Sequence, residues 1–239
     1  MPAPRRTVEF LKAGVLVIFV LLQVYLLFFK RHDTLALDVN ASDVPSPRVF
    51  GENRIGQSFV SPSGGLARID LLLESAKRTI GNDIGFRLSE TVPEKKVVRE
   101  ATIKGPDVKD NLYYPVEFKS LPDSKGRTYE FVLSSSASGF DNSVSVWMNN
   151  RDIYPGGSLL FNGAPARGDL AFRVYAKRPI IAEMGRIVSK YPGILGSRFF
   201  LAVVIVFFEA AAFVLLRMLL DFLFAGDRSV ARPGESQNA

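Results

Sequence analysis

The chain carries one long apolar run near each end, separated by a polar stretch of about 150 residues in which apolar residues recur in short alternating segments. The first run, Ala13 to Phe29, contains no charged residue, and the second, Phe199 to Leu216, is interrupted only by Glu209. Each run is close to the about 17 to 25 residues that cross a bilayer as a helix. The pattern therefore predicts two transmembrane helices on either side of one polar domain.

A cleaved signal peptide is the alternative interpretation of the first run. Arg5, Arg6 and Lys12 precede the run as in a signal peptide, and Thr34-Leu35-Ala36 resembles a cleavage site. The run exceeds the about 7 to 15 apolar residues of a signal sequence, however, and charged residues follow it directly. We therefore expect an uncleaved anchor.

Two spans place both termini on the same side of the membrane. The basic residues at the terminal ends of the two runs favour the cytoplasm for that side; they are Arg5, Arg6, Lys12, Arg217 and Arg228. Basic residues also crowd the opposite ends, so this orientation relies on the tendency of long domains to translocate with little regard to charge. We expect a two-pass protein of the cell inner membrane with a periplasmic, or otherwise extracytoplasmic, central domain.

The polar stretch predicts an antiparallel β-sandwich. Segments of period two, separated by turn residues, predict strands at 55–60, 67–73, 83–88, 97–103, 112–118, 128–134, 143–149, 158–161 and 169–176. No segment of helical period interrupts this series, which favours a mainly β fold with two antiparallel sheets, of jelly-roll-like or immunoglobulin-like kind, flanked by the two transmembrane helices. A closed barrel is the alternative.

The chain divides into seven expected segments. They are a cytoplasmic tail (1–12), transmembrane helix 1 (13–29), an irregular linker (30–47), the extracytoplasmic sandwich (48–178), an amphipathic helix and turn (179–197), transmembrane helix 2 (198–224) and a second cytoplasmic tail (225–239). In 179–197, Ile180, Met184 and Ile187 share one helical stripe, which is typical of a helix at the membrane interface or one packed on the sandwich.

Alternation also assigns side chains to the outer faces of the sandwich. In 143–149 the apolar residues at even positions point inward, which leaves the only tryptophan, Trp147, outward with Ser143, Ser145 and Asn149. Aromatic rings flanked by polar groups suit sugars, whose C–H faces stack while their hydroxyls bond. The outward residues that we expect to bind a glycan are Trp147, Tyr113, Arg87, Arg173, Tyr175 and Asp70. The alternative is a tryptophan packed under a loop or against a neighbouring subunit.

A succession of short motifs carries a resemblance to a known class of domain. They are Ile55-Gly56-Gln57-Ser58-Phe59-Val60, Gly65-Leu66-Ala67-Arg68-Ile69-Asp70, Lys109-Asp110-Asn111-Leu112-Tyr113-Tyr114, Asp123-Ser124-Lys125-Gly126, Tyr154-Pro155-Gly156-Gly157 and Gly168-Asp169-Leu170-Ala171-Phe172. Together they resemble β-sandwich segments of bacterial envelope proteins that occur beside membrane glycosyltransferases and polysaccharide-assembly proteins, and they are similar in outline to carbohydrate-binding-module jelly rolls. The resemblance covers 47–177 and implies a sandwich and a glycan ligand; it implies no catalytic residue.

The composition excludes several classes of function. The chain has 30 Lys+Arg and 24 Asp+Glu, but most of the surplus lies beside the apolar runs, where anionic lipid head groups explain it better than nucleic acid does. There is no cysteine and only one histidine, His32, beside the first run. Disulfides and thiolate metal sites are thus excluded, and a histidine-based zinc site or catalytic triad has one poorly placed candidate. We expect no enzyme, no cofactor and no metal.

Two loops contain oxygen ligands that could hold calcium. Asp107, Asp110 and Asn111 lie in one loop, and Asp141 and Asn142 lie in another. Neither loop has the dense acidic spacing of a calcium site, so we interpret these residues as turn formers. Paired carboxylates for glycoside hydrolysis are not singled out by any motif.

Glu209 is the residue most suggestive of function. It falls near the centre of the second span, where an acidic residue costs about 2.5 to 3.5 kcal/mol on insertion scales. Gln23 lies at a similar depth in the first span, so a hydrogen bond within the helix hairpin is feasible. The alternative is contact with another integral membrane protein, with Glu209, Gln23 and Arg217 as the interacting residues.

These patterns together predict a non-enzymatic, membrane-anchored accessory subunit. We expect its sandwich to serve cell-envelope polysaccharide assembly or glycan recognition, with the membrane, a second integral membrane protein and a glycan as partners, and without nucleic acid. The alternative function is a scaffold subunit whose sandwich binds only protein. A polar aromatic groove would favour the first, and a large exposed apolar patch the second.

Overall fold

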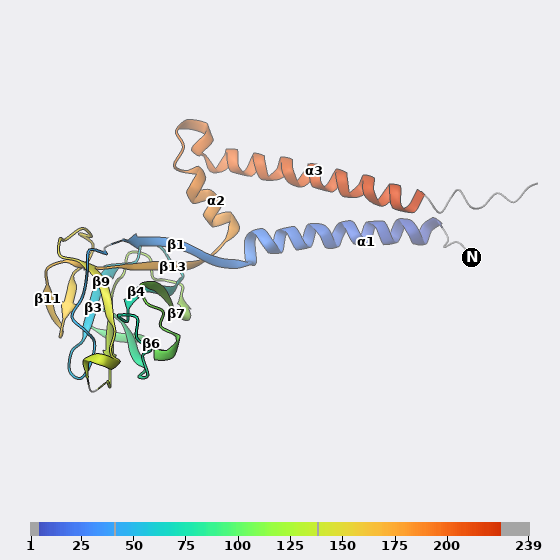
Figure 1. Ribbon diagram of the computed structural model, residues 1–239. Helices are drawn as coiled ribbons and strands as arrows, with labels where there is room; N and C mark the ends of the chain where they lie inside the picture. The colour runs from blue at the N-terminus through green and yellow to red at the C-terminus, as the bar shows by residue number, and fades with distance from the viewer. Residues whose placement is uncertain (1–4, 41, 138, 226–239) are drawn as a thin grey trace, which may run out of the picture. The chain divides into compact units, whose positions relative to one another are not determined.

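The protein forms two compact units in the computed structural model, which describes residues 5–40, 42–137 and 139–225 (Figure 1). One unit is the β domain His32–Arg178, and the other contains the helices on both sides of it. Residues 1–4 and 226–239 of the two expected tails, Arg228 among them, lie outside the described residues.

The β domain consists of two antiparallel sheets, which confirms the expected fold class. The first sheet has the order β1 (Arg31–Val39), β13 (Phe172–Pro179), β4 (Leu66–Glu74), β9 (Ser145–Asn149) and β12 (Asp169–Leu170), with β2 (Val44–Pro45) on β9 and β7 (Leu112–Leu121) on β4. The second has the order β11 (Ala164–Ala166), β10 (Leu159–Phe161), β3 (Ile55–Val60), β8 (Thr128–Ser135), β5 (Ile84–Glu90) and β6 (Lys96–Ile103). Short 3-10 turns lie at Gly105–Asp107 and Phe140–Asn142.

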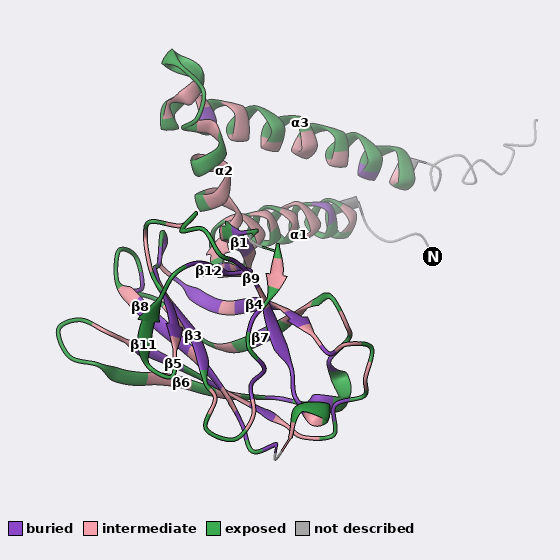
Figure 2. Cartoon of the chain, turned by 60° about the vertical axis from the view of Figure 1, so that its left-hand side comes forward, coloured by how far each residue is buried: buried purple, intermediate pink, exposed green. Residues whose placement is uncertain are grey.

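Aromatic side chains from the inner faces join the two sheets. Phe172 of β13 has its ring centroid 5.7 Å from that of Phe59 on β3 and 5.4 Å from that of Phe131 on β8. Phe86 of β5 stacks on Phe118 of β7 at 6.3 Å. All of these rings except Phe118, which is half-buried, are buried, and buried residues follow the strands of both sheets (Figure 2). This packing of hydrophobic rings is the core of the domain.

The structure departs from the expected elements at several points, among them the following two. The expected linker at 30–47 instead contains β1, an edge strand paired with β13, and the short strand β2. Its polar sequence concealed the strand, because β1 is held by partners far away in the chain. The expected strand at 169–176 is divided at Ala171, whose N–H donates to the Trp147 carbonyl while its own carbonyl accepts from Leu72. One residue therefore links β9 and β4.

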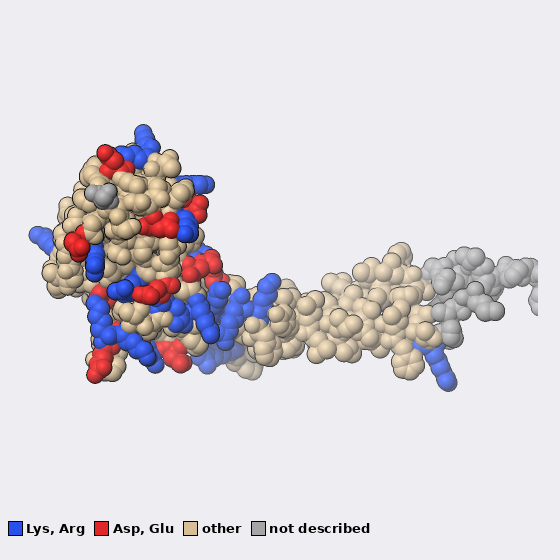
Figure 3. All heavy atoms as spheres, turned by 90° about the horizontal axis from the view of Figure 1, so that it is seen from below, with Lys and Arg blue, Asp and Glu red and all other residues tan. Residues whose placement is uncertain are grey.

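The helical unit contains two long apolar helices. The first is α1 (Arg5–Val24), which continues as the π-helical turn η1 (Tyr25–Phe29), and the second is α3 (Arg198–Ala225). Both are long and apolar enough to cross a membrane, with spans of 24 and 27 residues. The short helix α2 (Ile180–Val188) and the 3-10 turn η4 (Gly193–Gly196) precede α3. Figure 3 shows charged side chains of both signs over the β domain and a surface along the helices that is nearly free of charge.

A buried carboxylate ties the two sheets together. Asp169 of β12 is fully buried and accepts hydrogen bonds from Gln57 Nε2 at 3.0 Å and from the N–H groups of Ile153 and Tyr154 at 2.8 and 2.9 Å. Gln57 Oε1 in turn accepts from the N–H of Leu170 at 3.1 Å. Buried polar groups are tolerated when every one of them is bonded, and here a carboxylate matches three donors.

The variant Asp169→Asn tests this network. An amide at position 169 directs N–H groups at N–H donors, so we expect the free energy of unfolding to fall by about 2 to 3 kcal/mol. Urea unfolding of the full chain in detergent measures it, followed by the fluorescence of Trp147, which lies in the β domain. The exposed Asp123 provides the control, since Asp123→Asn removes the same charge and should change stability by less than about 0.5 kcal/mol. Equal midpoints for the two variants would contradict the prediction.

Candidate functional site

Four of the expected glycan-binding residues meet on the outer face of the first sheet. Arg173 of β13 pairs with Asp70 of β4, which pairs in turn with Pro115 of β7. The guanidinium of Arg173 lies 3.9 Å from the ring centroid of Tyr113, and its Nε donates to Asp38 of β1 at 3.2 Å. The register thus brings together residues from four strands.

Arg68 makes a second, similar set of contacts beside the first. Its Nε donates to Asp70 Oδ1 at 2.8 Å, and its Nη1 donates to Asp33 Oδ2 at 3.3 Å. Its guanidinium also covers the ring of Tyr175 at 3.9 Å. We call the whole set the arginine–tyrosine cluster; its members are Asp33, Asp38, Arg68, Asp70, Tyr113, Arg173 and Tyr175. Because Asp33 and Asp38 belong to β1, the cluster attaches this edge strand to the sheet.

The electrostatics of the cluster favour a structural role. Burial raises the pKa of Tyr113 more than the nearby Arg173 lowers it, and the Tyr113 hydroxyl is buried with no hydrogen-bond partner among the described residues. Burial is the largest single influence on the pKa of Arg68 and lowers it, but the hydrogen bond and charge of Asp70 and the contact with Tyr175 together raise the pKa overall. Guanidinium groups cover one face of each tyrosine ring, so that face is not available for stacking on a sugar.

Trp147 lies on β9 of the same sheet and is half-buried. Its Nε1 donates to Asn111 Oδ1 at 2.8 Å. The residues expected beside it on an open polar face, Ser143, Ser145 and Asn149, are only 1%, 2% and 5% exposed. Other parts of the chain therefore cover the polar side chains that alternation placed beside Trp147 on an outer face.

Arg87 lies in the second sheet, on β5, away from the cluster. Its Nε donates to Glu100 of β6 at 3.0 Å. Period-two alternation places Arg87 on an outer face, but it does not tell which sheet a strand joins. The sequence-predicted set is thus divided between the two sheets.

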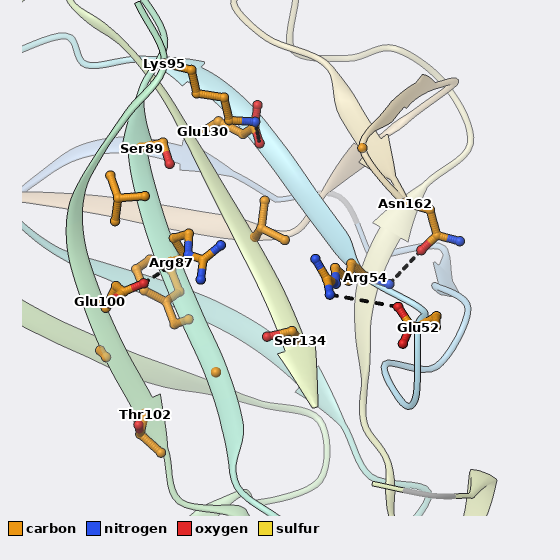
Figure 4. Close-up of a pocket in the computed structure, with 16 residues that line it drawn as sticks. Glu52, Arg54, Arg87, Ser89, Lys95, Glu100, Thr102, Glu130, Ser134 and Asn162 are labelled. Carbon is orange, nitrogen blue, oxygen red and sulfur yellow. Dashed lines mark hydrogen bonds and ion pairs between the residues drawn. The ribbon is translucent and has the colours of Figure 1, made fainter. Parts of the chain in front are cut away.

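Arg87 lines a shallow groove of about 910 Å³ on the outer face of the second sheet (Figure 4). The central strands present small side chains to it, namely Gly85 and Ser89 of β5 and Val132 and Ser134 of β8. Larger side chains stand around them, so the sheet surface is hollowed where the small residues align. The sequence does contain a signal for this groove, namely small residues at outward positions of several strands. The signal could not be interpreted without the strand register, which decides whether those residues lie side by side.

Three ion pairs line the groove. Lys95 Nζ lies 2.6 Å from Glu130 Oε1, Arg87 Nε lies 3.0 Å from Glu100 Oε1, and Arg54 Nη2 lies 3.9 Å from Glu52 Oε2. The sequence prediction missed these residues, except Arg87. With three cations and three anions, the groove carries no net charge.

A tight turn closes one side of the groove. Asn162 and Gly163 join β10 to β11 with φ angles of 49° and 82°, the left-handed pair that a two-residue type I′ hairpin turn requires. Asn162 Oδ1 accepts a hydrogen bond from the N–H of Arg54 at 2.8 Å. The turn is thereby held beside the floor of the groove, as Figure 4 shows.

The loops that could have held calcium use their oxygens within the protein. Asp110 Oδ1 accepts from the N–H of Ser75 at 2.8 Å, and Asn142 Oδ1 accepts from the N–H of Gly81 at 2.6 Å. Asp141 pairs with Arg78 at 2.9 Å. Within residues 5–40, 42–137 and 139–225, no group of three histidine or acidic side chains could hold a metal ion. These contacts agree with the interpretation of turn-forming residues.

The polar residues of the apolar helices are not bonded to one another. Glu209 and Gln23 are half-exposed, and no hydrogen bond joins them within the described chain. Arg217 is exposed on α3. The contact that does join the helices is an ion pair of 2.7 Å between Lys12 of α1 and Asp221 of α3.

Comparison with known proteins does not assign the chain to a family: no protein-family model and no curated protein matches it. The two antiparallel sheets agree with a β-sandwich, and nothing in the fold or the comparisons links the chain to carbohydrate-binding proteins.

The arginine–tyrosine cluster should control the opening of β1. Replacing Arg68 or Arg173 with Met removes ion pairing and a cation–π contact that are together worth on the order of 1 kcal/mol, so amides of β1 should exchange with solvent about fivefold faster. Hydrogen exchange of the full chain in detergent, read by mass spectrometry, measures this rate. Arg87→Met serves as the matched control in the other sheet. Unchanged β1 exchange in both variants would show that backbone pairing alone holds the strand.

Ionisation of Asp110 should make the free energy of unfolding depend on pH in the acidic range. Burial opposes its ionisation, but the N–H groups of Ser75, Lys77 and Ala76 stabilise the charged form and lower the pKa of Asp110 overall. The stabilisation is therefore complete above the unfolded pKa of about 3.9 and is lost as pH falls through the lower folded pKa. We expect the stability gap between the wild type and Asp110→Asn to be largest near about pH 6 and to shrink below about pH 4. A constant gap in urea unfolding would contradict this role.

Proposed function

We propose that the protein is a non-enzymatic accessory subunit of the cell envelope, anchored by α1 and α3 in the inner membrane, whose periplasmic sandwich binds a neutral polysaccharide. The observation that carries this proposal is the polar groove without net charge on the outer face of β5, β6 and β8. Grooves of 300 to 1,000 Å³ with a few convergent polar groups are the usual form of ligand sites.

The chemistry of the groove suits a chain of hydroxyl groups. Guanidinium and carboxylate groups of an exposed ion pair can each bond a hydroxyl, one as donor and one as acceptor, and Arg87 and Glu100 have 59% and 63% of their side chains exposed. Ser89, Ser134 and Asn162 add neutral donors and acceptors. The balance of charge gives no attraction for a polyanion, which favours a neutral polymer over an acidic one.

We therefore propose the groove of the second sheet as the glycan site, in place of the aromatic face of the first sheet. The only aromatic residue that lines the groove is Phe86, which is 2% exposed and points into the core. Recognition would therefore depend on hydrogen bonds and shape, and we expect it to be weaker than at a site with stacked rings.

A scaffold that binds only protein is the second candidate function. It is favoured by Glu209, a carboxylate near the middle of α3 with no hydrogen-bond partner among the described residues. On this alternative the groove would contact another protein subunit.

Binding of the full chain in detergent to an array of purified bacterial polysaccharides tests the proposal. Hydrogen bonds to a charged group contribute about 1.5 to 3 kcal/mol, so Arg87→Ala should weaken binding to neutral polymers about tenfold. Arg151→Ala is the matched control, because Arg151 is exposed and lies outside the groove. Ser134→Tyr fills the floor without changing charge and should weaken binding as well.

Thermal unfolding of each variant is measured in parallel, so that loss of binding is not confused with loss of folding. The binding results then distinguish the groove from the aromatic face and from the protein-only scaffold. Loss of binding in Trp147→Ala, with Arg87→Ala unaffected, would place the ligand on the aromatic face of the first sheet. Binding to no polysaccharide on the array would favour the protein-only scaffold.

A further inference from the structure

Each of the two apolar helices has one stripe that is less exposed than the rest of its surface, and we call the two stripes together the seam. The stripes consist of the residues that are less exposed than their neighbours at spacings of three and four, which places them on one face of each helix. They are Lys12, Val15, Leu16, Phe19, Gln23, Leu26 and Leu27 on α1, and Leu201, Val204, Ile205, Glu209, Ala212, Phe213, Leu216 and Leu220 on α3.

Side-chain contacts within the helical unit cover the residues at both ends of the seam. Lys12 bonds Asp221 at 2.7 Å, lies 3.4 Å from Glu9, and is 5.8 Å from the ring centroid of Phe224. Leu201, at the other end of α3, lies against α2, where Gly185 leaves room for it. Among the described residues of α1 and α3, only Lys12, Leu201 and Leu220 are buried.

The middle of the seam is half-open and holds both polar residues. Gln23 lies 11 residues from Lys12, and Glu209 lies 12 residues from Asp221, so their distances from the ion pair are about 16 and about 18 Å along the helices. They lie at similar depths on the less exposed stripe of each helix, yet neither has a hydrogen-bond partner among the described residues. A carboxylate and an amide in hydrocarbon both require one.

Among the described residues, no cation bonds Glu209. Lys12 is already bonded, Arg217 is eight residues away, or about 12 Å, and Lys30 and Arg198 flank the apolar runs at their other ends without a bond to Glu209. A second copy of the chain would bring another glutamate and another glutamine to this depth, which leaves the negative charge uncompensated. A helix of different sequence that carries a cation at this depth complements Glu209 better than a second copy does.

We propose that the middle of the seam binds a transmembrane helix of another protein that carries an arginine or lysine in its central turns. The cation bonds Glu209, and Gln23 completes the contact as a neutral donor and acceptor. Ala210, Ala211 and Ala212 directly follow Glu209, and such small side chains allow helices to approach closely. The proposal does not depend on the ligand of the groove, and each can fail alone.

Photocrosslinking in native membranes tests the proposal with two adjacent alanines. Ala212 lies on the seam and Ala211 is exposed beside it. With benzoylphenylalanine in place of Ala212, we expect one protein adduct at least about fivefold stronger than from Ala211, whose crosslinks should go to lipid. The crosslinked segment should be a transmembrane helix with a basic residue within one turn of its centre.

Glu209 variants then test the chemistry in the chain with the crosslinker at position 212. Glu209→Leu should reduce the adduct at least about fivefold and Glu209→Gln less, while the amount of each chain in the membrane is unchanged. Leucine in place of the partner's basic residue should have the same effect, and combining it with Glu209→Leu should add little further loss. An adduct with a second copy, a crosslinked helix without a basic residue, only lipid adducts, or equal recovery from Glu209→Leu would each overturn the proposal.

Discussion

The contact of Phe172 with Phe59 and Phe131 is the interaction on which the rest of the β domain depends. These rings come from different sheets, and their burial removes a large apolar area from water while fixing the distance between the sheets. Side chains alternate along a strand, so each inward ring sends its neighbours outward. Arg173 therefore lies on the outer face because Phe172 fills the core. The core decides which residues are available for function.

The two outer faces are used differently. On the first sheet, arginine and tyrosine side chains bond to one another and to β1, so the polar groups satisfy each other and close the surface. On the second sheet, small residues on the central strands leave a hollow, and the Arg87–Glu100 ion pair beside it remains exposed. A surface whose charges are paired but accessible can exchange those contacts for a ligand at little cost, whereas the cluster would have to open the edge of its sheet.

In the proposed membrane anchor, the helical unit follows a different constraint. In hydrocarbon the backbone must bond within the helix, and each polar side chain needs a partner. Lys12 and Asp221 meet this requirement near the terminal ends of the two helices. Glu209 and Gln23, in the middle, do not meet it within the chain. The seam therefore has a bonded ion pair at one end and two polar side chains without hydrogen-bond partners in its middle, which a purely apolar two-helix anchor would not have.

The sequence alone determined the local elements, because their causes are local. Alternation placed the strand at 55–60 without error, and the apolar runs predicted the long helices. Only the tertiary structure decided that 31–39 is a strand, since its aspartates bond partners such as Arg173, 135 residues from Asp38. It also decided that Arg87 belongs to a groove and Arg173 to a closed cluster. Alternation gives the face of a strand, but the neighbours across that face are set by pairing between distant segments.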